Sequence, residues 1–154
     1  MRCVLAVALL ILLGCSSAPE PAAKTESPPA AASVRDLSRL LPAAGLIGAK
    51  VVPDHLLDQP KMPGGTLGEY NARGKKYQLF IIEAENGQKA AFLLVDMKSA
   101  LKNPEYLSHM GGYFGSDGTK PVFVFAKLQY LAGVVGLPKD EADPIARVLA
   151  ARLR

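Results

Sequence analysis

The chain has 154 residues, of which 49% are apolar, and its formal net charge is +4. That charge is small and dispersed along the sequence, so we expect no nucleic-acid partner. Both cysteines, Cys3 and Cys15, lie within the first fifteen residues. The rest of the chain therefore has to fold without a disulfide and without a cysteine-based metal site.

The N-terminus carries one positive charge, Arg2, followed by an unbroken apolar run over residues 4–13. Ten helical residues rise about 15 Å, roughly half of the hydrocarbon thickness of a bilayer, so a membrane span is not predicted. A basic start, a short apolar run and small residues after it are typical of a secretory signal.

The end of the run, Leu12-Leu13-Gly14-Cys15, resembles the lipobox of bacterial lipoproteins. The resemblance implies cleavage before Cys15 and a lipid on its thiol, which would anchor the protein to a membrane. Ser16, where an Asp would retain such a protein in the inner membrane, implies an outer-membrane protein facing the periplasm if the host is Gram-negative. The structural alternative is an ordinary secretory signal with a free or buried Cys15.

Three segments follow from this interpretation: a cleaved signal peptide over residues 1–14, a lipidated tether over 15–33 and one folded domain over 34–154. The tether is rich in Ala, Pro and Ser and lacks large apolar side chains, so it has little surface to bury. The remaining 121 residues are enough for a single hydrophobic core.

The strand predictions run in chain order over residues 66–71, 76–85, 88–96, 120–126 and 129–136. A turn at Arg73-Gly74 joins the first two. Asn86-Gly87 predicts a second tight turn, because a type I′ hairpin needs positive φ at both central residues.

Helices are predicted at the two ends and in the middle of the domain. Residues 33–36 resemble a capping box ahead of an apolar stripe that Pro42 ends, and residues 98–110 predict one or two helical turns. Asp143-Pro144 opens a C-terminal helix that carries arginines towards its end. We therefore expect an α+β fold, a mainly antiparallel sheet of about five strands with N-terminal, middle and C-terminal helices packed on it.

The glycine-rich stretch over Gly111–Lys120 invites comparison with phosphate-binding loops. A strand follows it rather than a helix, and its glycine, threonine and lysine stand in the wrong order for a Walker A motif. We interpret Ser116-Asp117-Gly118 as a hairpin turn. The alternative is a loop that closes over a ligand.

His109 and the pair Asp54/His55 are the candidates for chemistry. His109 precedes a predicted helix end, where exposed carbonyls favour a partly positive imidazole; as a general base it would need Ser108 or Ser116 and an orienting acid. Asp54 and His55, with Asp58, lack the paired spacing of a zinc site. We expect no catalytic residue, no metal and no cofactor.

The aromatic residues Tyr113, Phe114 and Tyr130 lie near glycine-rich loops and form our predicted contact patch, since tyrosine is enriched in interface cores. The leading functional hypothesis is a non-enzymatic, membrane-anchored module that binds an envelope protein or polymer. The alternative is a small-molecule-binding or hydrolytic domain with a pocket near Gly111–Lys120.

Overall fold

The structure is a computed structural model that describes residues 34–154. Seven strands and two α-helices follow one another, with 3₁₀ turns η1 (Ser38–Leu40) and η2 (Leu56–Asp58) before β2. The elements are β1 (Leu46–Asp54), β2 (Pro63–Ala72), β3 (Lys75–Glu83), α1 (Gly87–Ala100), β4 (Lys102–Leu107), β5 (Gly112–Ser116), β6 (Pro121–Lys127), β7 (Tyr130–Val135) and α2 (Lys139–Arg152).

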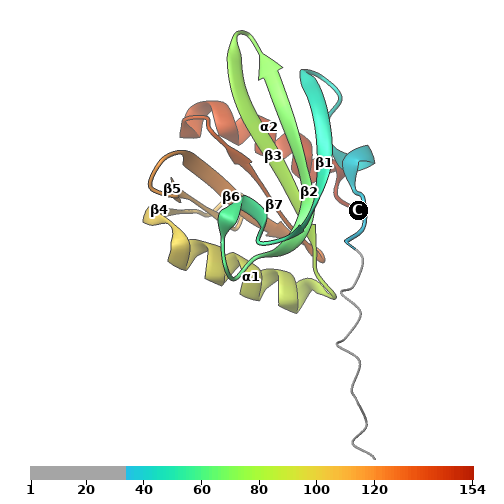
Figure 1. The fold of residues 1–154 in the computed structure, drawn as a ribbon. Helices are drawn as coiled ribbons and strands as arrows, with labels where there is room; N and C mark the ends of the chain where they lie inside the picture. Colours follow the sequence, from blue (N-terminus) through green and yellow to red (C-terminus); the bar gives the residue numbers. More distant parts are fainter. Residues whose placement is uncertain (1–33) are drawn as a thin grey trace, which may run out of the picture. The chain divides into compact units, whose positions relative to one another are not determined.

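All seven strands pair antiparallel in one sheet, in the order β1-β2-β3-β7-β6-β5-β4. The sheet consists of two meanders, β1–β3 and β4–β7, which meet where Ile81 of β3 lies opposite Ala132 of β7. Helix α1 carries the chain from the middle of the sheet to its far edge. Figure 1 shows this crossing, with α1 running along the sheet between β3 and β4.

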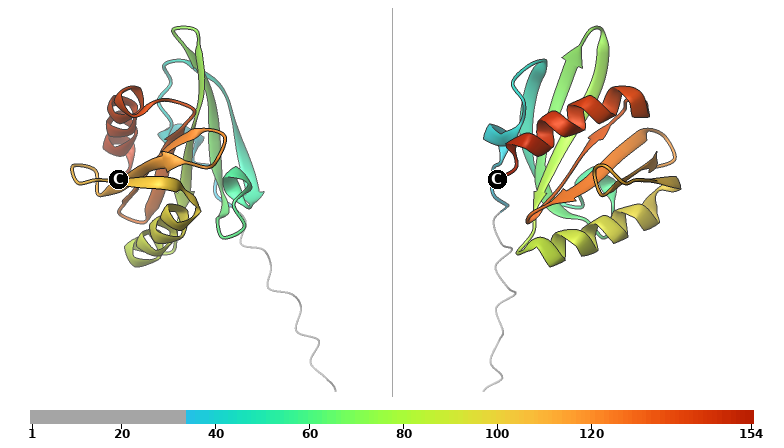
Figure 2. Two further views of the ribbon diagram at one scale, coloured as in Figure 1. Left: turned by 90° about the vertical axis from the view of Figure 1, so that its left-hand side faces the viewer. Right: turned by 180° about the vertical axis from the view of Figure 1, so that it is seen from behind.

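Each face of the sheet is covered by one helix and one 3₁₀ segment. Side chains alternate between the faces along a strand, so Leu79 of β3 packs towards α2 and η1 while Phe80 packs towards α1 and η2. Because both faces are buried, β3 and β7 are apolar on both alternations. Figure 2 shows β4–β7 between the two helices, and β1–β3 turning away from them.

The predicted arrangement of five strands and three helices is wrong. Within residues 34–154 the sheet has seven strands and the α-helices number two. Strands β1 and β4 were missed because each contains a proline, in Pro53 and Pro104, and little apolar alternation. Both are edge strands, where proline removes no hydrogen bond that the sheet needs.

The predicted hairpin at Asn86-Gly87 is also wrong, because residues 87–100 form α1. Asn86 is extended, with φ −159°, and its side chain accepts a hydrogen bond from the Lys89 amide at 2.9 Å, which caps the helix. Ala90, Leu94 and Met97 are buried at helical spacing. The run is rich in Ala, Leu and Lys, all strong helix formers, and contains one β-branched residue, Val95.

The other helix predictions need correction at their boundaries. The N-terminal helix is only the three-residue turn η1, and the helical turns predicted over 98–110 are the end of α1, β4 and the turn after it. The C-terminal helix begins at Lys139, one turn earlier than predicted, and keeps Pro144 inside it. Asp140 and Glu141 occupy its first turn, where acidic side chains favour the helix N-terminus.

Four of the predicted strands are confirmed as β2, β3, β6 and β7, the first two joined by the predicted turn. Arg73 and Gly74 have φ of 52° and 75°, and Ala72 pairs with Lys75 across them. Positive φ at both positions is what a two-residue type I′ turn requires. Neither helix of the described residues has the length and apolarity of a membrane span.

Candidate ligand-binding site

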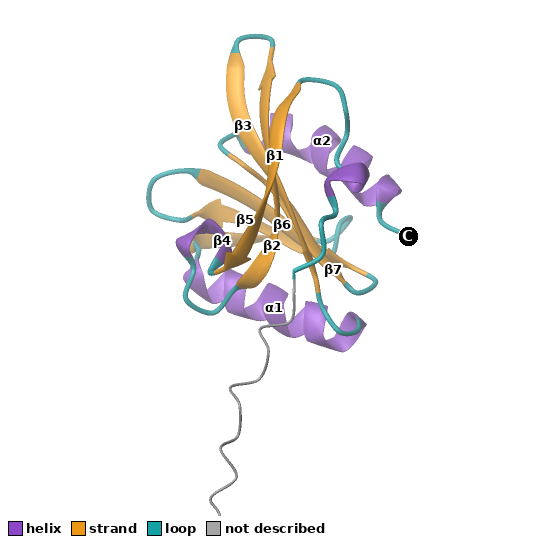
Figure 3. Cartoon of the chain, turned by 45° about the vertical axis from the view of Figure 1, so that its right-hand side comes forward, coloured by secondary structure: helices purple, strands orange, loops and turns teal. Residues whose placement is uncertain are grey.

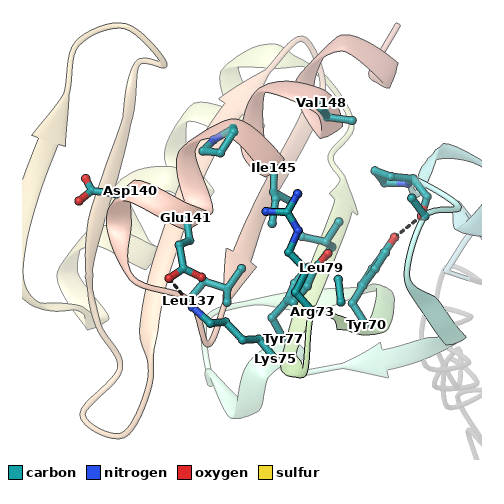
Figure 4. A pocket seen from close by; sticks show the side chains of 14 residues that line it. Tyr70, Arg73, Lys75, Tyr77, Leu79, Leu137, Asp140, Glu141, Ile145 and Val148 are labelled. Carbon is teal, nitrogen blue, oxygen red and sulfur yellow. Dashed lines mark hydrogen bonds and ion pairs between the residues drawn. The ribbon is translucent and has the colours of Figure 1, made fainter.

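A cavity of about 760 Å³ lies on the face of the sheet that α2 covers. The β2–β3 hairpin, α2 as far as Val148 and the chain after η1 form its walls (Figure 4). Its lining is mostly apolar and aromatic, and comprises Pro42, Ala44, Tyr70, Ala72, Arg73, Lys75, Tyr77, Leu79, Leu137, Asp140, Glu141, Pro144, Ile145 and Val148. Ligand pockets typically span about 300–1,000 Å³ and have such a lining.

The cavity exists because the β2–β3 hairpin extends past the part of the sheet on which α2 packs. Helix α2 packs on β6 and β7 through small residues, Ala142 and Ala146, which keep it close to those strands. The β2–β3 hairpin extends beyond this contact, as Figure 3 shows. An open pocket therefore lies between its outer half and α2, with Ala72, Ile145 and Val148 accessible at its surface and Tyr70, Tyr77 and Leu79 buried beneath.

Two stacked tyrosines form the floor of the cavity beside the hairpin turn. The rings of Tyr70 and Tyr77 lie 5.1 Å apart at an angle of 13°, and the Tyr70 hydroxyl donates to the Pro42 carbonyl at 2.8 Å. Burial, together with the neighbouring phenol of Tyr77, raises the pKa of Tyr70 to about 12. The hydroxyl is thus protonated and occupied, and the ring presents its apolar surface to the cavity.

The N-terminal segment, residues 35–45, crosses β2 and forms one wall. The Thr66 hydroxyl accepts a hydrogen bond from the Leu37 amide at 2.9 Å, and Thr66 is the one buried polar side chain of the described residues. A Cβ on Gly68 would lie 2.7 Å from the Leu41 side chain, so glycine is what allows the segment to approach. Leu37 and Leu41 are both buried in the same core.

The charged groups that line the cavity differ in whether they have a partner of opposite charge. Lys75 Nζ lies 2.5 Å from Glu141 Oε1, so this pair of rim charges is neutralised. Arg73, exposed at the hairpin turn, makes no hydrogen bond or ion pair with any side chain in residues 34–154. Figure 4 shows its guanidinium reaching across the mouth of the cavity towards Ile145, while Asp140 lies at the opposite end.

A second, polar cleft of about 460 Å³ brings His109 to the start of α2. His109 Nε2 lies 2.5 Å from Asp143 Oδ1, and Arg147 donates to the other oxygen of Asp143 at 2.8 Å. Partial burial opposes ionisation of Asp143, but these two hydrogen bonds prevail and lower its pKa. His109 thus lies in the turn between β4 and β5, not at a helix end as predicted.

The cleft provides the acid that the sequence left unspecified, but its geometry is that of a hydrogen-bonded pair at the surface. The side chain of His109 is 41% exposed, and Ser108, which lines the same cleft, forms no hydrogen bond with it in the described chain. A nucleophile and its base lie within hydrogen-bond reach in a hydrolase. Asp143 instead connects His109 to Arg147 and fixes the β4–β5 turn against α2.

The residues of the predicted contact patch lie on both sides of the sheet. Tyr130 is 5% exposed and, like Phe114, packs in the core on the α2 side. Tyr113 packs on the α1 side, where the Lys98 ammonium lies 5.0 Å from its ring centre and Tyr106 adjoins it. Adjacent strand residues point to opposite faces, so the structure does not bring the three together.

The Gly111–Lys120 stretch forms β5 and the turns at its two ends. Strand β5 was missed because glycine, which is depleted in strands, recurs along it. The predicted turn is confirmed: Ser116 pairs with Pro121, and Asp117 Oδ1 accepts hydrogen bonds from the amides of Thr119 and Lys120. Neither cleft described above is lined by this stretch.

The remaining sequence candidates are the Asp54/His55 pair and Cys15. His55 Nδ1 lies 3.1 Å from the carboxylate of Asp54, and no cluster of three metal-ligating side chains exists in residues 34–154. Cys15 and the predicted signal and tether lie outside the described residues.

The cavity was not predicted, although the sequence contained a signal for it. A two-residue turn at Arg73-Gly74 fixes the register of the hairpin and places Tyr70 opposite Tyr77. Two aromatic residues paired on one face of a long hairpin indicate a surface that needs a cover. The position of α2 against that surface is not encoded locally.

Comparison with protein-family models, curated protein sequences and solved structures found no match to this chain.

Proposed function

We propose that residues 34–154 form a non-enzymatic module that binds a small apolar ligand in the cavity between α2 and the β2–β3 hairpin, and that a lipid on Cys15 holds this module at a membrane. The observation that carries the proposal is the cavity itself. Its volume is about 760 Å³, and aromatic and aliphatic side chains dominate its walls. Aliphatic and aromatic walls that converge on a concave site of this volume are typical of small-ligand pockets.

The cavity favours a small ligand over a protein or polymer as the partner. A protein interface is broad and relatively flat, with about 800 Å² buried on each side. Here the apolar groups converge from three elements, with Tyr77 on the hairpin, Ile145 on α2 and Pro42 after η1. Such convergence surrounds a small molecule on several sides.

The anchoring half of the proposal rests on the sequence. The apolar run ends at Gly14-Cys15 and a tract rich in Ala, Pro and Ser follows. Two or more acyl chains give stable membrane attachment, whereas one chain binds reversibly. An anchored binding module samples membrane-derived ligands at a raised local concentration.

Filling the cavity tests the binding proposal. Ile145→Trp adds an indole where α2 faces Leu79, and Val95→Trp is the matched control on α1, where Val95 is 57% exposed. The probe is the uncharged dye N-phenyl-1-naphthylamine, added to the full-length chain. We expect saturable fluorescence enhancement with the unchanged chain and with Val95→Trp, and its loss with Ile145→Trp.

The chain has no tryptophan, so each introduced indole also reports its own environment. Ile145→Trp should show blue-shifted emission from a buried indole, and Val95→Trp the emission of an exposed one. Equal dye binding by both variants, with blue-shifted indole emission from Ile145→Trp, would contradict the proposed site.

Fractionation tests the anchor. Cys15→Ser should release the protein from membranes without changing its folding, whereas Cys3→Ser should leave it attached, because Cys3 lies in the expected signal peptide. A Cys15→Ser protein that stays with the membrane fraction after a high-salt wash would overturn the lipid anchor.

A further inference from the structure

Resting on the proposed binding function, we propose that the ligand is a single-chain anionic amphiphile. Its carboxylate or phosphate pairs with Arg73, and its alkyl chain lies along the solvent-accessible apolar lining residues Ala72, Ile145 and Val148. Such a head group fits the guanidinium, whose planar donors bind carboxylate and phosphate oxygens in pairs.

The first support is the pairing of charges around the cavity. Lys75 and Glu141 neutralise each other across its rim, and Tyr70 uses its hydroxyl on the Pro42 carbonyl. Arg73 is the one cationic lining residue with no such partner in residues 34–154. Its exposed guanidinium stands beside apolar walls, so an amphiphile could bury its chain and still keep its head group in a charge-assisted pair at the mouth.

The second support is the position of the Arg73 side chain, which the backbone of the turn sets. Arg73 has φ of 52°, in the left-handed region that glycine and asparagine occupy readily and longer side chains rarely adopt. The first position of the turn would thus be more stable with Asn or Gly. Leu128 has the same conformation in the β6–β7 turn, with φ of 53°, and lines neither cleft, so what distinguishes Arg73 is that its side chain lines the cavity (Figure 4).

The remaining charge, Asp140, sets the direction of the ligand. Its carboxylate lies at the end of the cavity away from Arg73 in Figure 4. An anionic head at Arg73 avoids this carboxylate, and the alkyl chain then covers the apolar walls. A cationic head placed at Asp140 is the opposite orientation, and the experiment distinguishes the two.

The experiment compares four probes that share a twelve-carbon chain: laurate, dodecyl phosphate, dodecanol and dodecyltrimethylammonium. Binding to the full-length Cys15→Ser chain is measured by calorimetry below the critical micelle concentrations, so no lipid on the protein competes. We expect laurate or dodecyl phosphate to bind about tenfold more tightly than dodecanol, as a charge-assisted pair provides. Preference for laurate indicates a fatty acid, and preference for dodecyl phosphate a phosphate-bearing lipid.

Variants at the turn then assign the preference to Arg73. Arg73→Gln keeps the strained turn and should bind laurate about as weakly as dodecanol, while Arg73→Lys should retain part of the preference. Lys76→Gln is the control, since Lys76 is exposed on the same hairpin and does not line the cavity. Unchanged laurate binding by Arg73→Gln, or tightest binding of dodecyltrimethylammonium, would overturn the anionic-ligand proposal alone. Failure of all four probes to bind would overturn this proposal together with the binding function.

Discussion

The two faces of the sheet are covered in the same way but are filled very differently. Each carries one helix of 14 residues and one 3₁₀ segment. On the α1 face the hollow beside the helix measures about 270 Å³, and on the α2 face about 760 Å³. The layer arrangement alone therefore does not determine whether a cavity forms.

The difference comes from the size of the buried side chains and the reach of the hairpin. Helix α1 packs Leu94 and Met97 into the sheet, and Phe80 fills the space above Gly133, where a Cβ would lie 2.6 Å from its ring. Helix α2 buries two alanines, Ala142 and Ala146, and one large side chain, Leu149. The pocket on the α2 face thus lies beside a helix that small residues set close to β6 and β7.

The largest expected loss of stability is at a fully buried position on the α1 face, and it is compared with the loss at a wall of the cavity. Phe80→Ala removes a fully buried ring on the α1 face and should lower the free energy of unfolding by about 3–5 kcal/mol. Ile145→Ala removes a partly exposed wall of the existing cavity and should cost about 1 kcal/mol. Urea unfolding of both variants measures the contrast, and equal losses would show that the α2 face is as tightly packed as the other.

The next effect concerns the N-terminal segment that covers part of the α2 face. Thr66→Val leaves the buried Leu37 amide without an acceptor and should destabilise the fold by about 1–3 kcal/mol. Thr66→Ser keeps the acceptor and serves as the control. Thermal unfolding should rank the two in this order, and a Val variant as stable as the Ser variant would exclude the hydrogen bond as the attachment.

The two helices differ in their N-terminal caps, and this difference predicts a smaller change in stability. Asn86→Ala removes the side-chain cap of α1 and should cost about 1 kcal/mol. Pro138 precedes α2 with no side-chain cap, so Pro138→Ala removes no such bond. Amide hydrogen exchange should show faster opening of the first turn of α1 in Asn86→Ala. Unchanged exchange there would argue against the cap.

The smallest effect is a pH dependence at the start of α2. The pKa of Asp143 is lowered in the folded protein, so its ionised form stabilises the fold above the ordinary value of 3.8. That stabilisation is lost as the pH falls through the lower folded-state pKa. Asp143→Asn should therefore be less stable at pH 7 by up to about 1 kcal/mol and should match the unchanged protein at low pH.

The control for this measurement lies on the other face. Asp96 of α1 faces Lys61 at 3.3 Å with both side chains well exposed, so Asp96→Asn should leave unfolding at pH 7 almost unchanged. A difference for Asp143→Asn that persists at low pH would show that charge is not its cause.

The sequence predicted best the elements whose signals are local. The turn at Arg73-Gly74 and the strands around it follow from residue types within a few positions. The prediction at Asn86-Gly87 was wrong because the same dipeptide occurs in type I′ turns and at helix N-termini. The residues that follow it determine which of the two forms. The edge strands β1 and β4 were not predicted because their prolines and exposed residues leave little apolar periodicity in the sequence.

The candidate site was beyond local reasoning because its residues are brought together only by the fold. Tyr70, Ile145 and Pro42 come from three elements, and nothing near any of them in the sequence indicates the other two. His109 and Asp143 likewise meet across 34 positions. Their contact depends on where α2 crosses the sheet, which is a property of the whole core.

The attachment of residues 35–45 across β2 has a mechanical consequence. A force that pulls on the chain at Val34 acts first on the Arg35–Glu83 pair and the Leu37–Thr66 bond. It acts next on the two carbonyls that Arg152 binds, at Arg39 and Leu40, and then on the Pro42–Tyr70 bond. Bonds loaded in sequence peel at low force. The segment that peels carries Pro42 and Ala44, which are walls of the cavity. Tension applied at Val34 would therefore disturb these walls of the cavity before it reached the strands of the sheet.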